Sequence, residues 1–326
     1  MIDLSIIIPM YNSESSIEKT INCILNQKYL PSYELIIVDD GSVDNSANIV
    51  LGFSESNPQI KLIRQSNQKQ AEARNNGLRN AQGNVICFID SDDTISENHF
   101  KFLVEPLLEN RDLNLSISGL RRVFEDSDKE EVELISNLEY SNSNLELIGN
   151  YLTKSKEMDV GLWNKGFRRE IIKSNYLTFN NENFFEDSLF IFNYLNCINF
   201  DEIIYINEAT YNLYKGSTST TTSFHPEIDA LSKKYISKIK SKSFELGLDE
   251  DIIDAFVMRT NIYVSHHHIK YDNKWDTSSQ KKLLSSMTNL KIIRNKYLED
   301  RYKFIMLLGK NTTYFYFHLY KIIKKK

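Results

Sequence analysis

The sequence predicts an α/β fold, in which helices flank a mostly parallel sheet and a helical C-terminal region follows. Three observations support this prediction. Short apolar segments alternate with helix-forming segments over the first 120 residues, a rhythm typical of parallel sheets. Several of the apolar segments end in clusters of polar side chains. After about residue 222, the pattern changes to long helical segments rich in Lys, Ser, Tyr and Ile.

Strands are predicted where short apolar runs suit burial on both faces of a sheet. They cover residues 4–9, 34–38, 60–63, 85–89 and 113–120. Helices are predicted between them. Ser15 and Glu18 match a capping box at the start of the first helix, and Asp44 and Ser96 are expected to cap two later ones. The later predicted helices cover residues 44–51, 71–81 and 96–109.

The rest of the chain divides into three parts. Residues 121–156 are acidic and polar and are expected to form a surface insertion. Residues 163–172 and 186–195 are interpreted as further elements of the first domain. The predicted domains are therefore residues 1–220, which contain the sheet, and residues 221–326, which are helical.

Composition excludes several classes of protein. Gly (11) and Pro (5) are scarce among the 326 residues, which argues against collagen, Gly-rich linkers and low-complexity disorder. The net charge of -5 provides no general attraction for nucleic acid, so no nucleic-acid partner is expected. The three cysteines, Cys23, Cys87 and Cys197, are far apart and lack zinc-site spacing. They are expected to be reduced thiols.

Targeting signals are also not expected. The N-terminal apolar stretch is short and contains Asp3 near its start, unlike a signal peptide. No window offers about 18 uninterrupted apolar residues, so no spanning helix is predicted. A cytoplasmic location follows as the expectation.

Polar clusters follow three of the predicted strands. Tyr11 and Asn12 come after the first, Asp39 and Asp40 close the second, and residues 90–93 follow the fourth. Ligands of such sheets bind outside the carboxyl ends of the strands. The sequence therefore places carboxylates where this architecture binds ligands.

Each cluster also has a simpler interpretation. The run Asp90-Ser91-Asp92-Asp93 suits Mg²⁺ or Mn²⁺ together with phosphate oxygens, but an isolated run of this kind is more often a solvated turn and helix cap. Asp39 and Asp40 suit contacts with a base and a ribose, or an ordinary strand-to-helix turn.

Two further charged segments also have a functional and a structural interpretation. Arg74 near a helix start suits a phosphate or an aspartate of the site, or a surface salt bridge. Glu186 and Asp187 follow two phenylalanines, which suits a general base of raised pKa or an acidic helix N-terminus. The run His266-His267-His268 is interpreted as an exposed part of a helix, because consecutive residues do not share one face.

Taken together, these segments resemble the inverting nucleotide-sugar glycosyltransferases of family two, which have the GT-A fold. The resemblance covers roughly residues 1–220 and rests on motifs in the right order. They are Ile7 to Asn12, Val38 to Ser42, Ala73 to Asn75 and Phe88 to Asp93, followed by Leu162 to Lys165, Arg168 to Glu170 and Phe185 to Asp187.

The resemblance implies a role for each matching residue. On the donor side, the nucleotide pocket would be lined by Pro9, Tyr11 and Asn12. Uracil and ribose would contact Asp39 and Asp40. Close to them would lie Arg74, Asp90 and Ser91. Asp92 would ligate the metal with Asp90, and Asp93 is a rival ligand. Asp187 would be the catalytic base, Glu186 would shape the site, and Trp163 would border the acceptor.

Two later segments match the family less closely. Tyr214 to Ser219 resembles a stretch that closes over the diphosphate, but Lys215 stands where Arg is commoner. His225 is a weak match to a third metal ligand. The expected cofactor is Mn²⁺ or Mg²⁺.

The implied reaction is transfer of a sugar from a nucleotide-diphospho-sugar, UDP-sugar in the first instance, to a hydroxyl of a glycan or lipid-linked acceptor in bacterial surface polysaccharide synthesis. The alternative is a non-catalytic nucleotide-sugar-binding subunit of an assembly complex. A sugar nucleotidyltransferase and a dinucleotide-binding dehydrogenase are disfavoured, because neither of their Gly-rich loops follows the first strand.

The C-terminal residues 301–326 combine aromatic and aliphatic residues with a final Lys324-Lys325-Lys326. This pattern suits an interfacial helix on an anionic membrane leaflet, or a terminal helix packed on its domain with a solvated tail. The first alternative predicts peripheral contact with the inner face of the cell membrane. A homo-oligomer is also among the expected partners.

Overall fold

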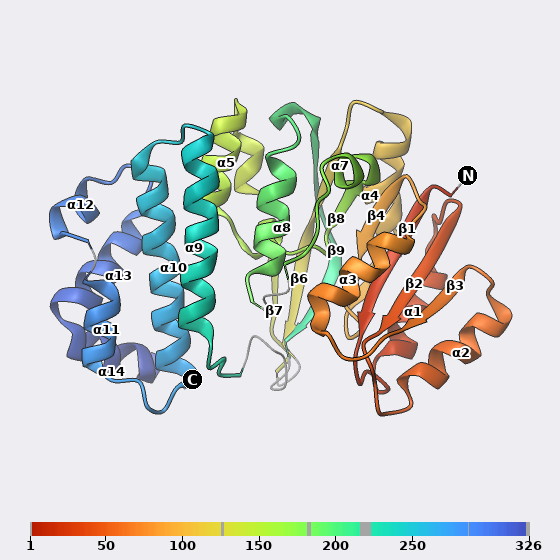
Figure 1. The fold of residues 1–326 in the computed structure, drawn as a ribbon, viewed down its shortest axis with the longest axis horizontal. Helices are drawn as coiled ribbons and strands as arrows, with labels where there is room; N and C mark the ends of the chain where they lie inside the picture. Colours follow the sequence, from red (N-terminus) through yellow and green to blue (C-terminus); the bar gives the residue numbers. More distant parts are fainter. Residues whose placement is uncertain (1, 125–126, 181–183, 216–222, 286, 324–326) are drawn as a thin grey trace. The chain divides into compact units, whose positions relative to one another are not determined.

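The computed structural model describes residues 2–124, 127–180, 184–215, 223–285 and 287–323. The chain forms two compact units (Figure 1). The first contains Met1–Leu147 and Ser155–Lys215, and the second contains Ile148–Lys154 and Gly216–Lys326. The predicted segment Gly216 to Ser219 lies outside the described residues.

The first unit is built on a mixed sheet with the strand order β3-β2-β1-β4-β8-β6-β9-β5, and β7 pairs with β6. The β3, β2, β1 and β4 strands are mutually parallel, whereas β8 runs antiparallel to both β4 and β6. The strands are β1 (Leu4–Met10), β2 (Tyr33–Asp39), β3 (Ile60–Arg64), β4 (Val85–Phe88), β5 (Thr94–Ile95), β6 (Leu115–Phe124), β7 (Glu130–Glu133), β8 (Lys165–Arg168) and β9 (Ile203–Lys215).

The parallel half of the sheet forms the core of this unit. Every residue of β1 and β4 is buried, as expected for parallel strands covered on both faces. Ile7 of β1 lies opposite Ile36 of β2 and Phe88 of β4. The α3 helix packs closely on β1, because a Cβ atom at Gly77 would lie only 2.4 Å from the Ile7 side chain.

The helices of the first unit connect these strands (Figure 1). They are α1 (Ile17–Leu25), α2 (Ser46–Ser56), α3 (Lys69–Asn80), α4 (His99–Glu109), α5 (Asn144–Lys154), which continues into the second unit, α6 (Glu157–Val160), α7 (Arg169–Ser174) and α8 (Glu186–Leu195), with short 3-10 turns at Asn137–Tyr140 and Phe200–Glu202.

Two predicted helix caps were wrong. The α1 helix follows Ser16, not Ser15, and the Ser16 side chain makes no cap hydrogen bond. The α4 helix follows Asn98, because Ser96 instead donates its backbone N–H to the Thr210 carbonyl at 2.8 Å. In the second case, pairing of β5 with β9 outweighs the local capping signal.

The prediction of a surface insertion over residues 121–156 was also wrong. Within it, β7 pairs antiparallel with β6, and α5 buries Leu147, Tyr151 and Leu152. The acidic residues of β7 remain partly or fully exposed, which explains why composition alone suggested a surface insertion.

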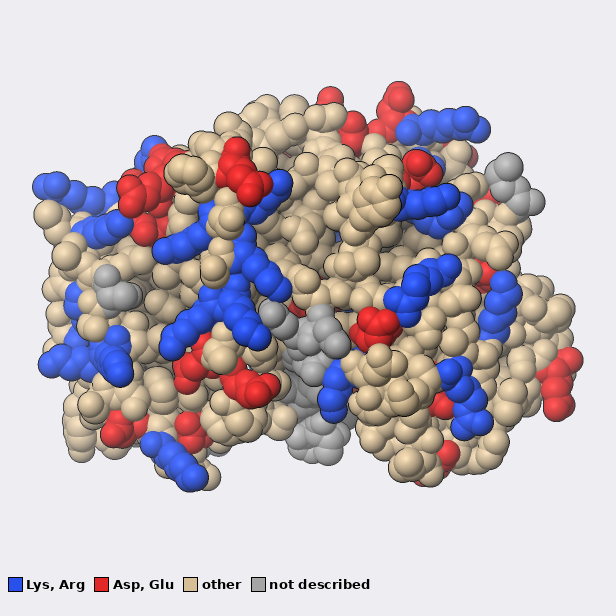
Figure 2. Space-filling view, in the orientation of Figure 1, with Lys and Arg blue, Asp and Glu red and all other residues tan. Residues whose placement is uncertain are grey.

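The second unit is helical, as the sequence predicts for this region. The interpretation of His266-His267-His268 as an exposed run was wrong, because His267 and His268 are buried. Its helices pack around a core that includes Ala255, Met258, Ile262 and Leu284. Lys side chains gather along the exposed face of α9 (Figure 2). The helices are α9 (Ile228–Glu245), α10 (Glu250–Tyr271), α11 (Thr277–Leu284), α12 (Asn289–Arg294), α13 (Asp300–Asn311) and α14 (Thr313–Ile323).

Candidate functional site

The carboxyl ends of β1 and β2 are held together by hydrogen bonds. The backbone N–H of Asp40 donates to the Met10 carbonyl at 2.8 Å. Beyond the strands, the Asn12 N–H donates to Ser42 Oγ, and Asn12 Oδ1 accepts from the Val43 N–H, both at 2.9 Å. The segments that follow the two strands therefore form one surface, on which the Tyr11 side chain is half exposed.

Asp39 and Asp40 are buried and accept hydrogen bonds from the protein. Asp39 Oδ1 accepts from the Ser42 N–H at 2.8 Å, and its Oδ2 faces Arg64 Nε at 3.3 Å. Asp40 accepts at 2.8 Å from the backbone N–H groups of Gln68 and Lys69, and from the Gln65 side chain. Asp40 thus fixes the turn that leads into α3.

Arg74 of α3 connects the acidic residues of two other segments. Its side chain is only 1% exposed. Its guanidinium donates to Asp90 after β4 at 3.0 Å and to Asp187 of α8 at 2.7 Å, and Glu186 lies 3.7 Å away. Burial opposes the charge of Arg74, but these carboxylates raise its pKa. Asp187, Asp90 and Arg74, distant in sequence, therefore meet at one place.

Burial changes the proton affinity of the two acidic residues on α8. It raises the pKa of Asp187 to about 6, although the Arg74 charge opposes this shift. Burial and the charge of Asp187 together raise the pKa of Glu186 to about 8. The Asp187 side chain remains 26% exposed. A carboxylate with raised pKa and solvent access is suited to accept a proton.

The acidic run after β4 is divided between the interior and the solvent. Asp93 is buried, and its two oxygens accept from the Tyr211 hydroxyl and the Tyr214 N–H, both at 2.8 Å. Burial raises its pKa well above the usual range. Asp92 is exposed, and Ser91 Oγ contacts Ser13 Oγ at 2.8 Å. Asp93 therefore ties the acidic run after β4 to β9, from the buried side of the run.

The acidic run after β4 offers carboxylates to a divalent cation. Across the described ranges, no group of three or more His, Cys, Asp or Glu side chains is arranged to hold a metal. The exposed Asp92 and the partly exposed Asp90 nevertheless offer carboxylate oxygens at one strand end. Mg²⁺ and related hard cations are commonly bound by one or two carboxylates plus substrate phosphates. Asp90 and Asp92 fit this mode of binding, in which two carboxylates and substrate phosphates hold the cation.

Trp163 lies beneath this run. Its indole is 7% exposed and stacks on Tyr211, with the ring centroids 5.2 Å apart. The Tyr211 hydroxyl accepts from the Asp90 N–H at 3.2 Å in addition to its bond with Asp93. Trp163 thus supports the acidic run from within the protein.

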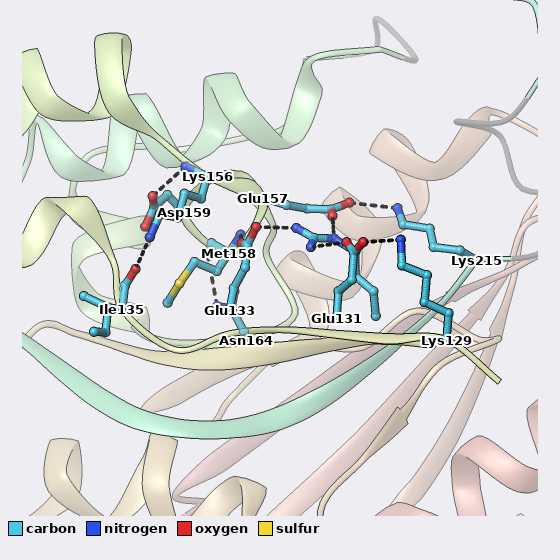
Figure 3. Close-up of polar contacts among 11 residues, drawn as sticks. Lys129, Glu131, Glu133, Ile135, Lys156, Glu157, Met158, Asp159, Asn164 and Lys215 are labelled. Atoms are coloured by element: carbon cyan, nitrogen blue, oxygen red, sulfur yellow. Dashed lines mark hydrogen bonds and ion pairs between the residues drawn. The ribbon is translucent and has the colours of Figure 1, made fainter. Parts of the chain in front are cut away.

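Lys215 belongs to an ion-pair network (Figure 3). Its Nζ lies 2.8 Å from Glu157 Oε1, and Glu157 also pairs with Arg122. Arg122 in turn pairs with Glu131 and Glu133 of β7. The charges of Lys215 and Arg122 lower the pKa of Glu157 despite its burial. Lys215 is therefore held by Glu157, at the end of β9.

Among the described residues, four besides glycine have a left-handed backbone conformation; Tyr176 is exposed after α7, and the other three lie next to the site. Asn12, Lys69 and Phe185 have φ values of 49°, 73° and 67°, although side chains disfavour this region. Asn12 lies two residues after β1, Lys69 begins α3, and Phe185 immediately precedes α8. Gly41, with φ of 82°, provides the same turn after β2 without steric cost. Residues in such strained conformations are held in place by the surrounding structure and are common at active sites.

The structure brings Arg74, Asp90, Glu186 and Asp187 together and joins Asn12 to the segment after Asp40. Lys215 pairs with Glu157 instead of with another predicted site residue. Gln70, Tyr211, Glu157 and Lys165 were not predicted as site residues. Gln70 donates to Asp90 at 3.2 Å. The sequence carried no local signal for Tyr211 or Glu157, because both act through contacts between distant segments. His225 belongs to the second unit.

Comparison with known proteins points to one family. The family profile described as Glycosyl transferase family 2 matches residues 5–175. The chain is 30% identical over 282 residues to the uncharacterized glycosyltransferase EpsJ of Bacillus subtilis, covering 82% of this chain and 76% of that protein. It is 32% identical over 192 residues to the minor teichoic acid biosynthesis protein GgaA of the same species, covering 57% and 42%.

A third relative is much longer than this chain. Glycosyltransferase GlyA of Streptococcus pneumoniae is 28% identical over 245 residues, which are 71% of this chain and 34% of that protein. The chain therefore spans about a third of the length of GlyA.

Solved structures share the fold. Residues 1–349 of S. aureus TarS align with 99% of this chain and 91% of that chain, with a TM-score of 0.64 and 16% identity. That fragment has also been solved with UDP-GlcNAc. The mannosyltransferase PcManGT of Pyrobaculum calidifontis, solved with GDP-Man and Mn²⁺, aligns with 98% of this chain and 86% of that chain, with a TM-score of 0.52 and 13% identity.

Arg74→Met is expected to destabilise the metal-free protein in a pH-dependent way. The folded-state pKa values of Asp187 and Glu186, about 6 and about 8, lie above their ordinary values, so ionising them costs stability as the pH rises. Removal of the compensating cation increases that cost. The expected loss in the free energy of unfolding is about 3–5 kcal/mol near pH 8 and smaller near pH 5, measured by urea denaturation.

Arg79→Met is the matched control on the same helix. Arg79 is exposed and pairs with Glu72 at 2.8 Å, so its loss should cost less than about 1 kcal/mol at either pH. A cost for Arg74→Met that equals the control, or that does not grow with pH, would contradict the assigned charge compensation.

Proposed function

The chain belongs to glycosyltransferase family 2, and from this premise we propose that it transfers a sugar from a nucleoside diphosphate sugar to an acceptor hydroxyl with inversion. It is an enzyme with the GT-A fold. The observation that carries the proposal is the meeting of Asp90, Asp187 and Arg74 at the carboxyl edge of the sheet. Asp90, on the proposed donor side, and Asp187, the candidate base, both pair with the Arg74 guanidinium there.

Asp187 is the proposed catalytic base. Its raised pKa and its 26% exposure suit removal of a proton from an acceptor hydroxyl. The hydroxyl oxygen then attacks the anomeric carbon, the bond to the diphosphate oxygen breaks, and the proton remains on Asp187. A single displacement inverts the anomeric configuration, and no second carboxylate nucleophile is needed. Arg74 orients Asp187, and Glu186 shapes the same surface.

The proposed donor surface is formed by the segments after β1, β2 and β4. Tyr11 is half exposed, so its ring is available to stack on a nucleobase. The other donor-side residues, named below, would form the rest of the nucleotide pocket. The TarS fragment solved with UDP-GlcNAc favours a UDP-sugar as the donor. The proposed donor-side residues are Pro9, Tyr11, Asn12, Asp39, Asp40, Arg74, Asp90 and Ser91.

Asp92, with Asp90, is the proposed holder of Mn²⁺ or Mg²⁺. When bound, such a cation supplies positive charge to the diphosphate leaving group. PcManGT was solved with Mn²⁺ and GDP-Man, which supports a metal in this fold. Asp93 is not proposed as a ligand, because both of its oxygens already accept hydrogen bonds within the protein.

Two other residues complete the proposed site. Lys215 would approach the donor diphosphate after releasing Glu157, with which it pairs. Trp163, which is only 7% exposed, would border the acceptor and donor sugar. The acceptor class is proposed to be a glycan or a lipid-linked glycan of the bacterial surface, because the relative GgaA is named for teichoic acid biosynthesis.

We further propose that the second unit contacts an anionic membrane surface. One face of α14 packs on its unit through Tyr316 and Phe317, while Phe315, Leu319 and Ile322 are exposed. These three recur at the spacing of one helical stripe. The sequence continues with three lysines, whose charge complements anionic lipid. Among the helices of the described ranges, none has the length and apolar content of a membrane span.

Asp187→Asn is expected to abolish turnover without abolishing donor binding. Asparagine keeps the shape of the side chain but cannot accept the proton, so nucleotide release from UDP-GlcNAc should fall by about 10²–10⁴-fold. The measurement compares UDP release with UDP-GlcNAc affinity by calorimetry, both with Mn²⁺. Asp201→Asn, an exposed carboxylate of the same unit, is the control. Full turnover by Asp187→Asn would contradict the assigned base.

The double substitution Phe315→Gln with Leu319→Gln should weaken membrane binding. Each exposed apolar side chain contributes about 1.5–3 kcal/mol when buried in lipid, so partitioning onto phosphatidylglycerol vesicles should fall by at least about tenfold. Flotation of the full chain measures this. Leu51→Gln, an exposed leucine of α2, is the control. Equal flotation of the double variant and the control would exclude this surface.

A further inference from the structure

A lysine is fully buried at the start of β8. Lys165 is 0% exposed, and its Nζ lies 2.6 Å from the Met158 carbonyl, 2.5 Å from the Gly161 carbonyl and 3.0 Å from Asn164 Oδ1. An ammonium group has three N–H donors, so each has an acceptor here. The lysine thus clamps the end of α6 and the turn after it.

Asn164 reinforces the clamp from the preceding position in the chain. Its Nδ2 donates to the Ser118 carbonyl of β6 at 2.5 Å and to the Met158 carbonyl at 3.0 Å. The contact with Met158 is visible in Figure 3. The Met158 carbonyl therefore accepts from both Asn164 and Lys165, and the segment is tied to the sheet.

The clamped segment carries Trp163. The indole lies so close to Gly161 that a Cβ atom there would approach three ring carbons to 2.3–2.5 Å. The ring plane lies within 19° of that of Tyr211. Through its hydroxyl, Tyr211 contacts Asp93 and the backbone of Asp90. A continuous path of contacts therefore leads from Lys165 to the acidic run.

A buried ammonium is a costly way to stabilise a fold. Burial lowers the pKa of Lys165 to about 7, although Asp159 and Asp187 oppose this shift. Replacing buried charges by apolar side chains is often neutral or stabilising. What an apolar side chain could not supply is the set of three directed hydrogen bonds that fixes residues 158–161.

We propose that Lys165 and Asn164 are positioning residues for the transfer reaction. They hold residues 158–161 so that Trp163 supports Tyr211, and Tyr211 in turn fixes the backbone of Asp90 and the carboxylate of Asp93. The kinetic part of this inference rests on the proposed function. The structural part, that Lys165 and Asn164 fix the position of the Trp163 ring, is independent of the proposed function.

The test uses Trp163 as its own reporter. The chain has two tryptophans, so Trp275→Phe leaves Trp163 as the only one. In that background, Lys165→Met should shift the emission of Trp163 to longer wavelength and increase its quenching by acrylamide. The kcat for UDP-GlcNAc hydrolysis should fall by about 10–100-fold. Lys173→Met, in the last turn of α7, should change neither.

A second variant covers the case in which Lys165→Met fails to fold. Gly161→Ala keeps Lys165 but intrudes on the indole, so it should cause the same emission change and the same loss of kcat. Unchanged emission and kcat in a folded Lys165→Met protein with only a lowered melting temperature would overturn the inference, as would unchanged emission in Gly161→Ala. If the parent chain hydrolyses no UDP-GlcNAc, that donor assignment fails, and the emission result still decides the seating of Trp163.

Discussion

The carboxyl edge of the sheet depends on one buried cation. Arg74 lies between Asp90 and Asp187, with Glu186 nearby, in surroundings where ionised carboxylates are costly. Neighbouring ionised carboxylates repel one another there, and the charge of Arg74 offsets part of that cost for Asp90 and Asp187. The same arrangement places a candidate proton acceptor opposite the acidic run that suits a cation. In this way, the need for charge compensation also determines the geometry of the site.

Several segments have to adopt unfavourable backbone conformations to reach this arrangement. The left-handed residues Asn12, Lys69 and Phe185 each lie where the chain enters or leaves the carboxyl edge. Asp40 offsets part of the cost, because it accepts hydrogen bonds from the N–H groups of Gln68 and Lys69. Packing beneath the edge, through Trp163 and Tyr211, holds the acidic run from the other side.

The parallel half of the fold could be predicted from sequence, because β1, β2 and β4 are apolar runs whose burial depends little on context. Prediction failed where tertiary contacts outweigh local signals. Ser96 resembles a helix cap, yet its backbone pairs with Thr210. Residues 121–156 have the acidic, polar composition of a surface insertion, yet they add β7 to the sheet.

The candidate site shows the same division. The acidic residues at strand ends were recognisable, since parallel strands bring their carboxyl ends to one edge. The partners that fix them were not, because Tyr211 and Glu157 reach the site from segments far along the chain. Lys165 was visible as part of a motif, but its burial and its three carbonyl and amide acceptors are properties of the folded chain alone.

Anomalous diffraction from a crystal grown with UDP and Mn²⁺ tests most directly whether this edge is one catalytic site. The expected result is a single strong Mn²⁺ peak bonded to the Asp92 carboxylate and to diphosphate oxygens, with Asp187 facing the same cavity across Arg74. A peak bonded elsewhere, or UDP bound away from the ends of β1, β2 and β4, would contradict the assignment.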